Sequence, residues 1–318
     1  MKTKSLTRLL SLSLLAGGLL FTACKKKTEE KQDDTTTTDT EQSSAQDNSV
    51  AESIDNDIQA MGSQGAETGT LSTFRSNGQG GIGEISMAPC ATVTTVQGSK
   101  IFTVDFGTTG CTGSDGKTRT GKLIYDFSGS TNGALYYRHP GFKMTVTSSN
   151  YVVDNYSVTI SNKTIQNTTP TTITPGYNPG TSLTWSVTAS ISITKPSNGG
   201  TVSWSCNRTH ELMNTSDTNC YRGQTKPIIW SKAKLKMNGT ASGVNSSNEN
   251  YSVVATDLVR DFNCSPVALQ PHRHPFISGT LVYTPGSRPA RTIDYGSGAC
   301  DLTATITVSG QSFTYVQP

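Results

Sequence analysis

Hydrophobic and aromatic residues are scarce in this sequence. The residues Ala, Val, Ile, Leu, Met, Phe, Trp, Tyr and Cys make up 33% of the chain, and the three aromatic types 7%. Both values are low for a densely packed domain. The C-terminal part, from Ser86 on, is rich in Thr, Ser, Val, Tyr, Gly and Asn, a composition that favours half-buried strands joined by turns.

Motifs of common catalytic and metal sites are also missing. No cysteines stand at the spacing of a CxxC or zinc-finger site, and no GxSxG element marks a nucleophile. Without residues 1–23 the chain has as many Lys and Arg as Asp and Glu residues, 23 of each. A neutral chain has no electrostatic reason to bind nucleic acid. We therefore expect no metal, no cofactor, no catalytic residue and no nucleic-acid partner.

The N-terminus has the pattern of a bacterial lipoprotein signal. Lys2, Lys4 and Arg8 precede an apolar run, Leu9–Phe21, which is shorter than the roughly 20 residues of a membrane-spanning helix. Ala23 and Cys24 follow. We expect residues 1–23 to be cleaved and the Cys24 thiol to carry a lipid such as palmitate. Phe21 stands where the usual motif has Leu, so an ordinary secretory signal that is cleaved elsewhere is the alternative.

Residues 24–85 are predicted to be a tether. Residues 25–86 carry five basic and twelve acidic residues, a net charge of −7, whereas residues 87–318 carry a net charge of +7. We expect a solvated tail; the alternative is a weak attraction to the basic part of the chain, which salt would screen within about 8–10 Å. A capping-box pattern at Ser49 and an apolar spacing predict one short helix over residues 49–61, followed by a Gly/Ser/Asn linker.

Residues 86–318 are predicted to be an all-β body. Apolar and polar residues alternate over many short segments, and no helical pattern interrupts them. Strands without crossover helices imply antiparallel pairing. We expect an antiparallel β-sandwich or a layered meander, with two similar units of about 86–195 and 196–318 as one possible division. Predicted strands include 92–96, 101–106, 123–127, 142–147, 151–153, 156–160, 183–189, 202–206, 228–237, 251–259, 277–283, 302–308 and 313–316.

Six cysteines besides Cys24 are even in number, which in an exported chain predicts disulfides. The segment 104–111 resembles the segment 293–300: each has an apolar residue, Asp, an aromatic residue and a Gly-containing turn before Cys. Each is also preceded by a Cys-x-x-Val stretch. From this repeat we infer three pairs, namely Cys90–Cys111, Cys264–Cys300 and, as the remainder, Cys206–Cys220.

Polar candidates have structural explanations that we favour. Asp105 and Asp294 occupy matching positions in this repeat and could act as two carboxylates, but an Asp before a Gly turn usually accepts backbone N–H groups. His272 and His274 could bind a metal from one strand face. Pro271 and Pro275 flank them and favour a loop instead.

The three tryptophans divide by strand alternation. Trp185 and Trp204 share faces with apolar residues and are predicted to lie in the core, Trp204 beside a disulfide. Trp230 is predicted to share the opposite face of its strand with lysines. This face could bind a sugar or an anionic surface, although a solvated face covered by lysine stems is the simpler explanation. The candidate ligand-binding residues are Trp230, Lys232, Lys234 and Lys236.

Several of these motifs together resemble a family of lipoproteins of Bacteroidetes bacteria. The resemblance rests on the signal ending at Cys24, the charged tether, the Asp105–Cys111 element, the segments 115–121 and 239–243, and the closing segment 295–305. It implies attachment to the outer membrane, facing the periplasm or the cell surface, and implies no activity. We expect a non-enzymatic structural or binding module that meets the membrane through its lipid and binds an envelope protein. A surface glycan-binding protein is the alternative, and a hydrolase the third choice.

Overall fold

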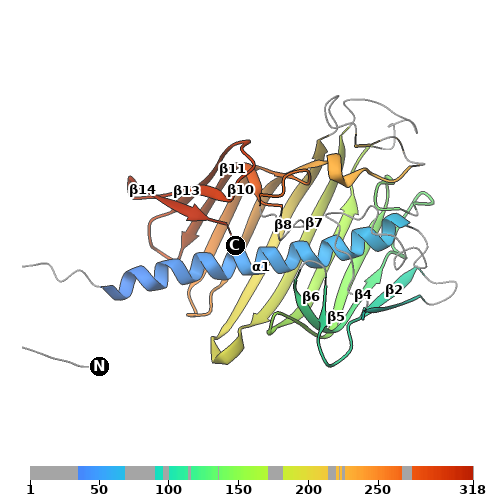
Figure 1. Ribbon diagram of the computed structural model, residues 1–318, viewed down its shortest axis with the longest axis horizontal. Coiled ribbons are helices and arrows are strands. Elements are labelled where there is room, and N and C mark those ends of the chain that lie inside the picture. The colour runs from blue at the N-terminus through green and yellow to red at the C-terminus, as the bar shows by residue number, and fades with distance from the viewer. Residues whose placement is uncertain are drawn as a thin grey trace, which may run out of the picture. The chain divides into compact units, whose positions relative to one another are not determined.

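A single antiparallel sheet and one long helix form the fold (Figure 1). The computed structural model describes residues 35–68, 90–95, 100–113, 116–134, 136–170, 182–213, 220–221, 223, 226–266 and 274–317. The chain divides into Met1–Thr35 and a compact unit, Thr36–Pro318, that contains every strand. Cys24 lies outside the described residues, so its lipidation stays a prediction.

The sheet has 14 strands, and neighbouring strands are joined as hairpins almost throughout. Its order follows the chain from β1 to β14, except that β3 pairs only with β4. The strands are β1 (Thr92–Thr95), β2 (Ile101–Asp105), β3 (Cys111–Thr112), β4 (Thr118–Asp126), β5 (Lys143–Val153), β6 (Tyr156–Asn167), β7 (Leu183–Thr194), β8 (Thr201–Met213), β9 (Lys234–Val244), β10 (Asn250–Asp261), β11 (Phe276–Pro285), β12 (Arg291–Ser297), β13 (Thr303–Val308) and β14 (Gln311–Val316).

The predicted all-β, antiparallel class is confirmed, and its form is the meander. No second sheet packs face to face on the first within the described residues, so the sandwich is not observed. The sheet also continues across the possible boundary near residue 195, because β7 and β8 pair from Leu183 with Leu212 to Thr194 with Thr201. Several strands are longer than predicted; residues 142–153, for example, contain one strand rather than two.

Side chains alternate between the two faces most regularly in the central strands β7 and β8. In β7 the residues from Leu183 to Ile193 that point inward are buried, and those between them, all Ser or Thr, are partly exposed. The neighbouring strand β8 has the same alternation. In these strands one face is therefore buried, largely apolar and aromatic with a few basic residues such as Arg208, and the other carries many hydroxyl groups, as the period of two requires.

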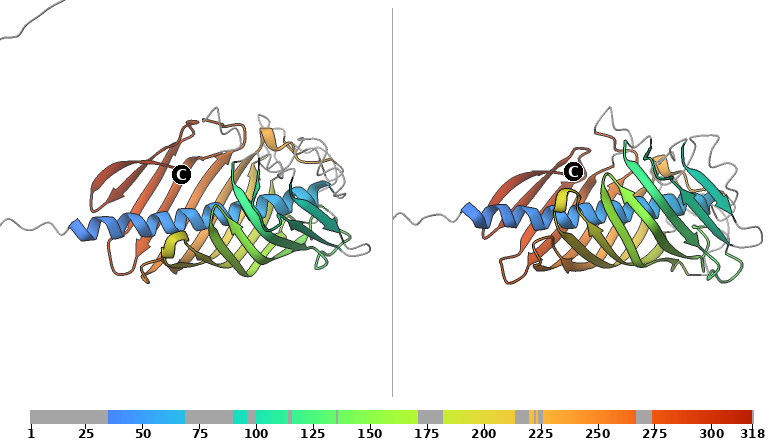
Figure 2. Two further views of the ribbon diagram at one scale, coloured as in Figure 1. Left: turned by 60° about the horizontal axis from the view of Figure 1, so that its bottom comes forward. Right: turned by 90° about the horizontal axis from the view of Figure 1, so that it is seen from below.

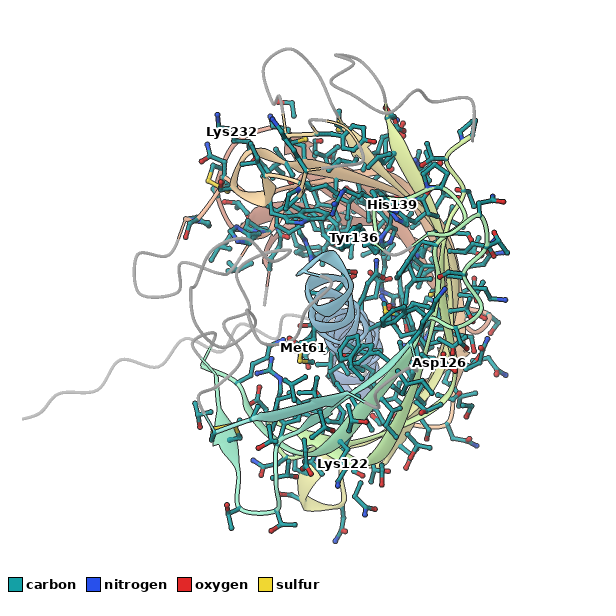
Figure 3. All side chains as sticks on the ribbon, turned by 90° about the vertical axis from the view of Figure 1, so that its right-hand side faces the viewer. Met61, Lys122, Asp126, Tyr136, His139 and Lys232 are labelled. Carbon is teal, nitrogen blue, oxygen red and sulfur yellow. A yellow bond between two sulfur atoms is a disulfide. The ribbon has the colours of Figure 1, made fainter. Side chains whose placement is uncertain are left out.

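The sheet curls around the helix (Figures 2 and 3). Register shifts interrupt several strand pairs, and glycines with positive φ, Gly121, Gly239 and Gly279, lie at three of them. Gly121 (φ 76°) and Gly239 (φ 123°) approach a neighbouring backbone so closely that a Cβ atom would lie 2.0 Å and 2.3 Å from the carbonyl oxygens of Asn150 and Asn207. Bulges and glycine kinks of this kind bend a sheet toward one face.

Helix α1 (Thr35–Thr68) lies along the inner face of this curled sheet (Figure 1). A helix is therefore present where residues 49–61 were predicted to form one, but the observed helix is much longer, with 34 residues. The capping-box residues Ser49 and Glu52 lie in the middle of the helix rather than at its start. From Asp47 to Ser63 the side chains are buried or partly buried, apart from Ser53, so the central part of the predicted tether belongs to the core.

Aromatic side chains fill the remaining space between helix and sheet. Tyr137 stacks on Trp185 with ring centroids 4.5 Å apart, and the Trp185 indole N–H donates to the Tyr137 carbonyl at 2.9 Å. Phe102 stacks on Tyr125 at 4.7 Å. The predicted core position of Trp185 is confirmed, because its side chain is fully buried.

Candidate functional site

Four acidic residues of α1 each bind a basic residue from a different part of the sheet. Asp57 binds Arg119 of β4, Asp55 binds Lys163 of β6, and Glu52 binds Arg208 of β8. Asp47 binds Lys195, the residue that follows β7. The four acids belong to the segment whose net charge is −7, and the four bases belong to the segment whose net charge is +7.

Two of these ion pairs are almost completely enclosed. The Lys163 ammonium lies 2.6 Å from Asp55 Oδ1, and its side chain has no exposed surface. Arg119 binds Asp57 with two parallel hydrogen bonds, from Nε to Oδ2 at 3.1 Å and from Nη2 to Oδ1 at 2.7 Å. This forked arrangement fixes the orientation as well as the distance of the two groups.

The other two pairs join the helix to β8 and β9 and to two turns of the sheet. Arg208 donates to Glu52 and, through Nη1, to the carbonyl oxygen of Gly239 at 3.0 Å. Asp47 accepts three hydrogen bonds: from Lys195 Nζ at 2.7 Å, and from the Ser246 backbone N–H and hydroxyl at 2.8 Å and 2.6 Å. Asp47 therefore links the β7–β8 and β9–β10 turns through one carboxylate.

Uncharged hydrogen bonds continue the same contact along the helix. The Trp204 indole N–H donates to Asn48 Oδ1 at 3.1 Å, and the Tyr125 hydroxyl donates to the Ile58 carbonyl at 2.9 Å. The Gln59 amide N–H lies 3.2 Å from His210 Nδ1. Because the amide nitrogen can only donate, Nδ1 of His210 is the acceptor and the ring proton is on Nε2.

His210 is neutral in this environment. Burial lowers the pKa of its imidazole to about 3, and the positive charges of Lys163, Arg208 and Arg260 act in the same direction. A protonated imidazole would have no carboxylate partner among the groups that it contacts here. Burial likewise lowers the pKa of the Arg260 guanidinium, which stacks on the Phe276 ring at 4.7 Å.

Buried ion pairs of this kind add little net stability to the fold, but they select one position of the helix against the sheet. Moving two charges out of water costs about as much as their attraction returns, but leaving one of them without its partner is strongly unfavourable. Sliding α1 along the sheet by one turn would separate all four pairs at once. The four acids therefore define the axial position and rotation of a helix that has few apolar residues to define it.

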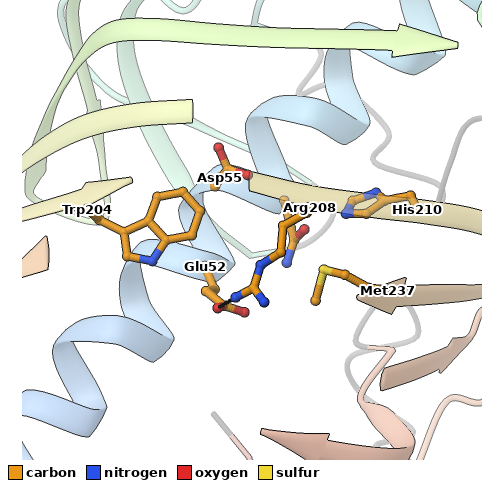
Figure 4. Close-up of a pocket in the computed structure, with 7 residues that line it drawn as sticks. Glu52, Asp55, Trp204, Arg208, His210 and Met237 are labelled. Atoms are coloured by element: carbon orange, nitrogen blue, oxygen red, sulfur yellow. Dashed lines mark hydrogen bonds and ion pairs between the residues drawn. The ribbon is translucent and has the colours of Figure 1, made fainter. Parts of the chain in front are cut away.

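A small recess lies beside this network (Figure 4). Its walls come from the helix and from β8 and β9, and its interior has room for about one water molecule. Its acids and bases are already engaged with each other, as Glu52 is with Arg208 and Asp55 with Lys163. The lining residues are Glu52, Asp55, Asn56, Trp204, Arg208, His210 and Met237.

The candidate ligand-binding surface at Trp230 is not formed. The predicted strand over residues 228–237 begins only at Lys234, and Trp230–Lys232 is a short 3-10 helix that turns the indole inward. Trp230 is 2% exposed and packs edge-on against Phe262 with ring centroids 5.5 Å apart. The prediction failed because it assumed the two-residue alternation of a strand for residues 228–233, which precede β9.

The lysines of that surface also point to different partners. Lys236 lies 2.7 Å from Glu211 of β8, and this hydrogen bond raises the pKa of the lysine. Lys234 lies 3.4 Å from Asp261, and Lys232 is exposed on the 3-10 helix (Figure 3). A stripe of lysines around an exposed aromatic ring is therefore absent from this part of the described structure.

Two of the three predicted disulfides are confirmed. Cys90 bonds to Cys111, and Cys264 bonds to Cys300. The third pair is wrong, because Cys206 and Cys220 are buried thiols. Burial raises the pKa of the Cys206 thiol to about 12. Trp204, expected beside a disulfide, instead binds Asn48 of the helix. The third pair was inferred only because two cysteines remained. Cys206 instead occupies an inward position of β8, where a thiol can be buried without forming a disulfide.

The structural explanation of Asp105 and Asp294 agrees with their contacts. Asp105 accepts the Gly107 N–H at 2.9 Å, and Asp294 accepts the Gly296 N–H at 2.8 Å. His272 lies outside the described residues, whereas His274 Nδ1 lies 2.7 Å from the Cys264 carbonyl oxygen. No three His, Cys, Asp or Glu side chains gather as a metal site in the described part of the chain.

Comparisons with models of known protein families, with curated protein sequences and with solved structures give no match. The helices in the described part of the chain include none that combines the length and apolarity required to cross a bilayer. The contacts between α1 and the sheet are therefore the physical basis on which a function can be argued.

Proposed function

We propose that this chain is a lipid-anchored protein of the bacterial outer membrane that acts as a non-enzymatic structural or binding module. The N-terminal signal ending at Cys24 and the resemblance to Bacteroidetes lipoproteins support the location. The arrangement of α1 within the sheet supports the non-enzymatic part of the proposal.

The observation that carries this proposal is that the protein fills its own interior. A curled sheet can enclose a small ligand or substrate within its concave face, but here α1 takes that space. The acidic side chains of the helix neutralise four bases of the sheet and its turns, Arg119, Lys163, Lys195 and Arg208. Side chains held in such pairs stabilise the position of the helix and are not available to bind a ligand. A binding partner would therefore contact the outer surface or an edge of the sheet.

The location is tested by labelling and fractionation in a Bacteroidetes host. We expect the full chain to incorporate labelled palmitate and to sediment with the outer membrane. Cys24→Ser should abolish both, whereas Cys220→Ala should retain both, because that thiol lies in the body. Labelling that survives Cys24→Ser, or outer-membrane association without any lipid, would contradict the proposed anchor.

The non-enzymatic part is tested separately on the purified protein with panels of chromogenic esters, glycosides and peptides. We expect no turnover above that of a heat-unfolded sample. Saturable turnover that co-purifies with the folded chain would overturn this part and leave the anchor standing.

A further inference from the structure

The last strand of the sheet, β14, is an open edge. It pairs with β13 on one side, and it ends the strand order of the described sheet. Ser309 and Gly310, both with positive φ, form the two-residue turn between these strands. In such a hairpin Val308 and Gln311 are the hydrogen-bonded pair that closes the turn, and such pairs recur at every second residue.

This pattern identifies the free backbone groups of the edge. Gln311 and Phe313 direct their N–H and C=O groups toward β13, and the Gln317 N–H, in the same phase, donates to the Leu302 carbonyl at 2.9 Å. Ser312, Thr314 and Val316 therefore direct theirs away from the sheet. A row of this kind is a template for one more strand.

The side chains of β14 do nothing to block such pairing. No residue from Gln311 to Gln317 is charged or proline, although charges and prolines are the usual means of protecting an edge. Phe313 is 53% exposed and Val316 is 64% exposed, and the two side chains point to opposite faces of the sheet. An added strand would cover both.

The opposite edge of the sheet is much less suited to pairing. Strand β1 has four residues, and the disulfide between Cys90 and Cys111 closes the chain just before it. Short edge strands limit the number of intermolecular hydrogen bonds. The two edges therefore differ, and β14 is the one with the length and composition to pair.

We propose that β14 is a docking strand for β14 of a second copy of this chain. In the antiparallel register centred on Thr314, that residue faces its own counterpart, and Ser312 faces Val316 of the partner copy. This register places all six outward residues, three from each copy, in hydrogen-bonded pairs, which is about six backbone hydrogen bonds. Two copies related in this way form one continuous sheet and close as a two-fold dimer.

The β14 strand of a second copy fits this edge better than two other partners, the β1 strand of another copy and a lipid surface. The strand is uncharged, so two identical strands meet without repulsion. Pairing β14 with β1 of another copy would be head-to-tail and open-ended, and would use the shorter edge. A lipid surface would cover Phe313 but would leave the N–H and C=O groups of Thr314 without partners, which is costly in an apolar phase. The inference does not depend on the lipid anchor.

Cysteine cross-linking in cells tests the register. We expect the full chain with Thr314→Cys to give a disulfide-linked dimer on a non-reducing gel after mild oxidation. Val254→Cys is the matched control, because Val254 is 46% exposed but lies on β10, away from the edge; it should give at least about tenfold less dimer. Equal cross-linking of the two variants, or cross-linking of Thr314→Cys only to a co-expressed Thr94→Cys on β1, would overturn the proposal.

Co-purification of two differently tagged copies tests the hydrogen bonds. Thr314→Pro removes an outward N–H that β13 does not use, so the fold should persist and co-purification should fall about tenfold. Val254→Ser should leave it unchanged, and intact near-UV circular dichroism checks the fold of both. Unchanged co-purification of Thr314→Pro would refute the pairing, as would a monomeric wild type whose binding to phosphatidylglycerol vesicles is lost with Phe313→Ser.

Discussion

At the scale of single residues, His210 makes stability depend on pH. The imidazole is neutral in the folded protein, where its pKa is about 3, but it titrates near 6.5 when the chain is unfolded. Below pH 6.5 the unfolded state therefore binds a proton that the folded state does not. The free energy of unfolding falls as pH decreases, by up to about 1.4 kcal/mol per pH unit.

We expect the wild-type protein to lose about 2 kcal/mol more than His210→Gln between pH 7 and pH 5, measured by urea unfolding followed by tryptophan fluorescence. His139→Gln serves as the control, because that histidine lies in the turn before Pro140 and packs on the Tyr136 ring. The same pH dependence in wild type and His210→Gln would mean that the imidazole is already charged in the fold.

Some residue-level features were predictable and others were not. The turn role of Asp105 and Asp294 followed from local chemistry, since an Asp two residues before a backbone N–H needs no distant partner. The partners of Asp55 and Asp57 are 108 and 62 residues away in the sequence. A pattern of neighbouring residues cannot predict partners that are so far apart in the sequence. The signal that could have indicated them was the opposite net charge of the two segments, from which we predicted a solvated tail, with a weak and screened attraction as the alternative.

At the scale of elements, α1 is a helix that its surroundings impose. Its mean composition is polar, and it begins in a run of four threonines, residues with modest helix propensity. Only the short apolar spacing around Ile54 and Ile58 was recognisable in the sequence. From Asp47 to Ser63 the helix is supported by burial and by pairing with the sheet, as tertiary contacts generally stabilise helices.

Gly62 shows how closely the helix fits. A Cβ atom at this position would lie 2.5 Å from the Tyr125 ring and 2.7 Å from the end of Met144. The ring cannot move away, because it stacks on Phe102 and its hydroxyl binds the Ile58 carbonyl.

In an ordinary helix Gly→Ala is stabilising by about 1 kcal/mol, but we expect Gly62→Ala to lower the unfolding free energy by about 1–3 kcal/mol through overpacking. Ser53→Ala, at an exposed position of the same helix, should change it by less than about 0.5 kcal/mol. Urea unfolding of both variants measures the difference. Stabilisation by Gly62→Ala would mean that the helix lies farther from β4 than described.

At the scale of the whole molecule, α1 is part of the core of the sheet. The antiparallel class and most strands were predictable because alternation is a local property. That the strands form one curled sheet was not, since curvature depends on bulges at glycines such as Gly121 and Gly239 and on what the sheet encloses. A solvated tether would be dispensable for folding, whereas an enclosed helix is not.

Shortening the chain distinguishes these two alternatives. We expect residues 35–318 to retain a cooperative urea transition, and residues 69–318 to lose it, because Tyr125, Trp185 and their neighbours would face water. Adding a synthetic peptide of residues 35–68 should restore near-UV circular dichroism to the shorter chain. A cooperative transition in residues 69–318 alone would assign the helix to the surface.

The starting point of α1 sets how far the body can stand from a membrane. A free tether of residues 25–85 would allow excursions of well over 100 Å at full extension, at about 3.3–3.6 Å per residue. Because α1 begins at Thr35, the span from Cys24 to the start of the helix is only about 36–40 Å when fully stretched. If Cys24 carries lipid as proposed, the start of α1 stays within this distance of the bilayer. Diffusion then brings the edges of different copies together in two dimensions rather than three.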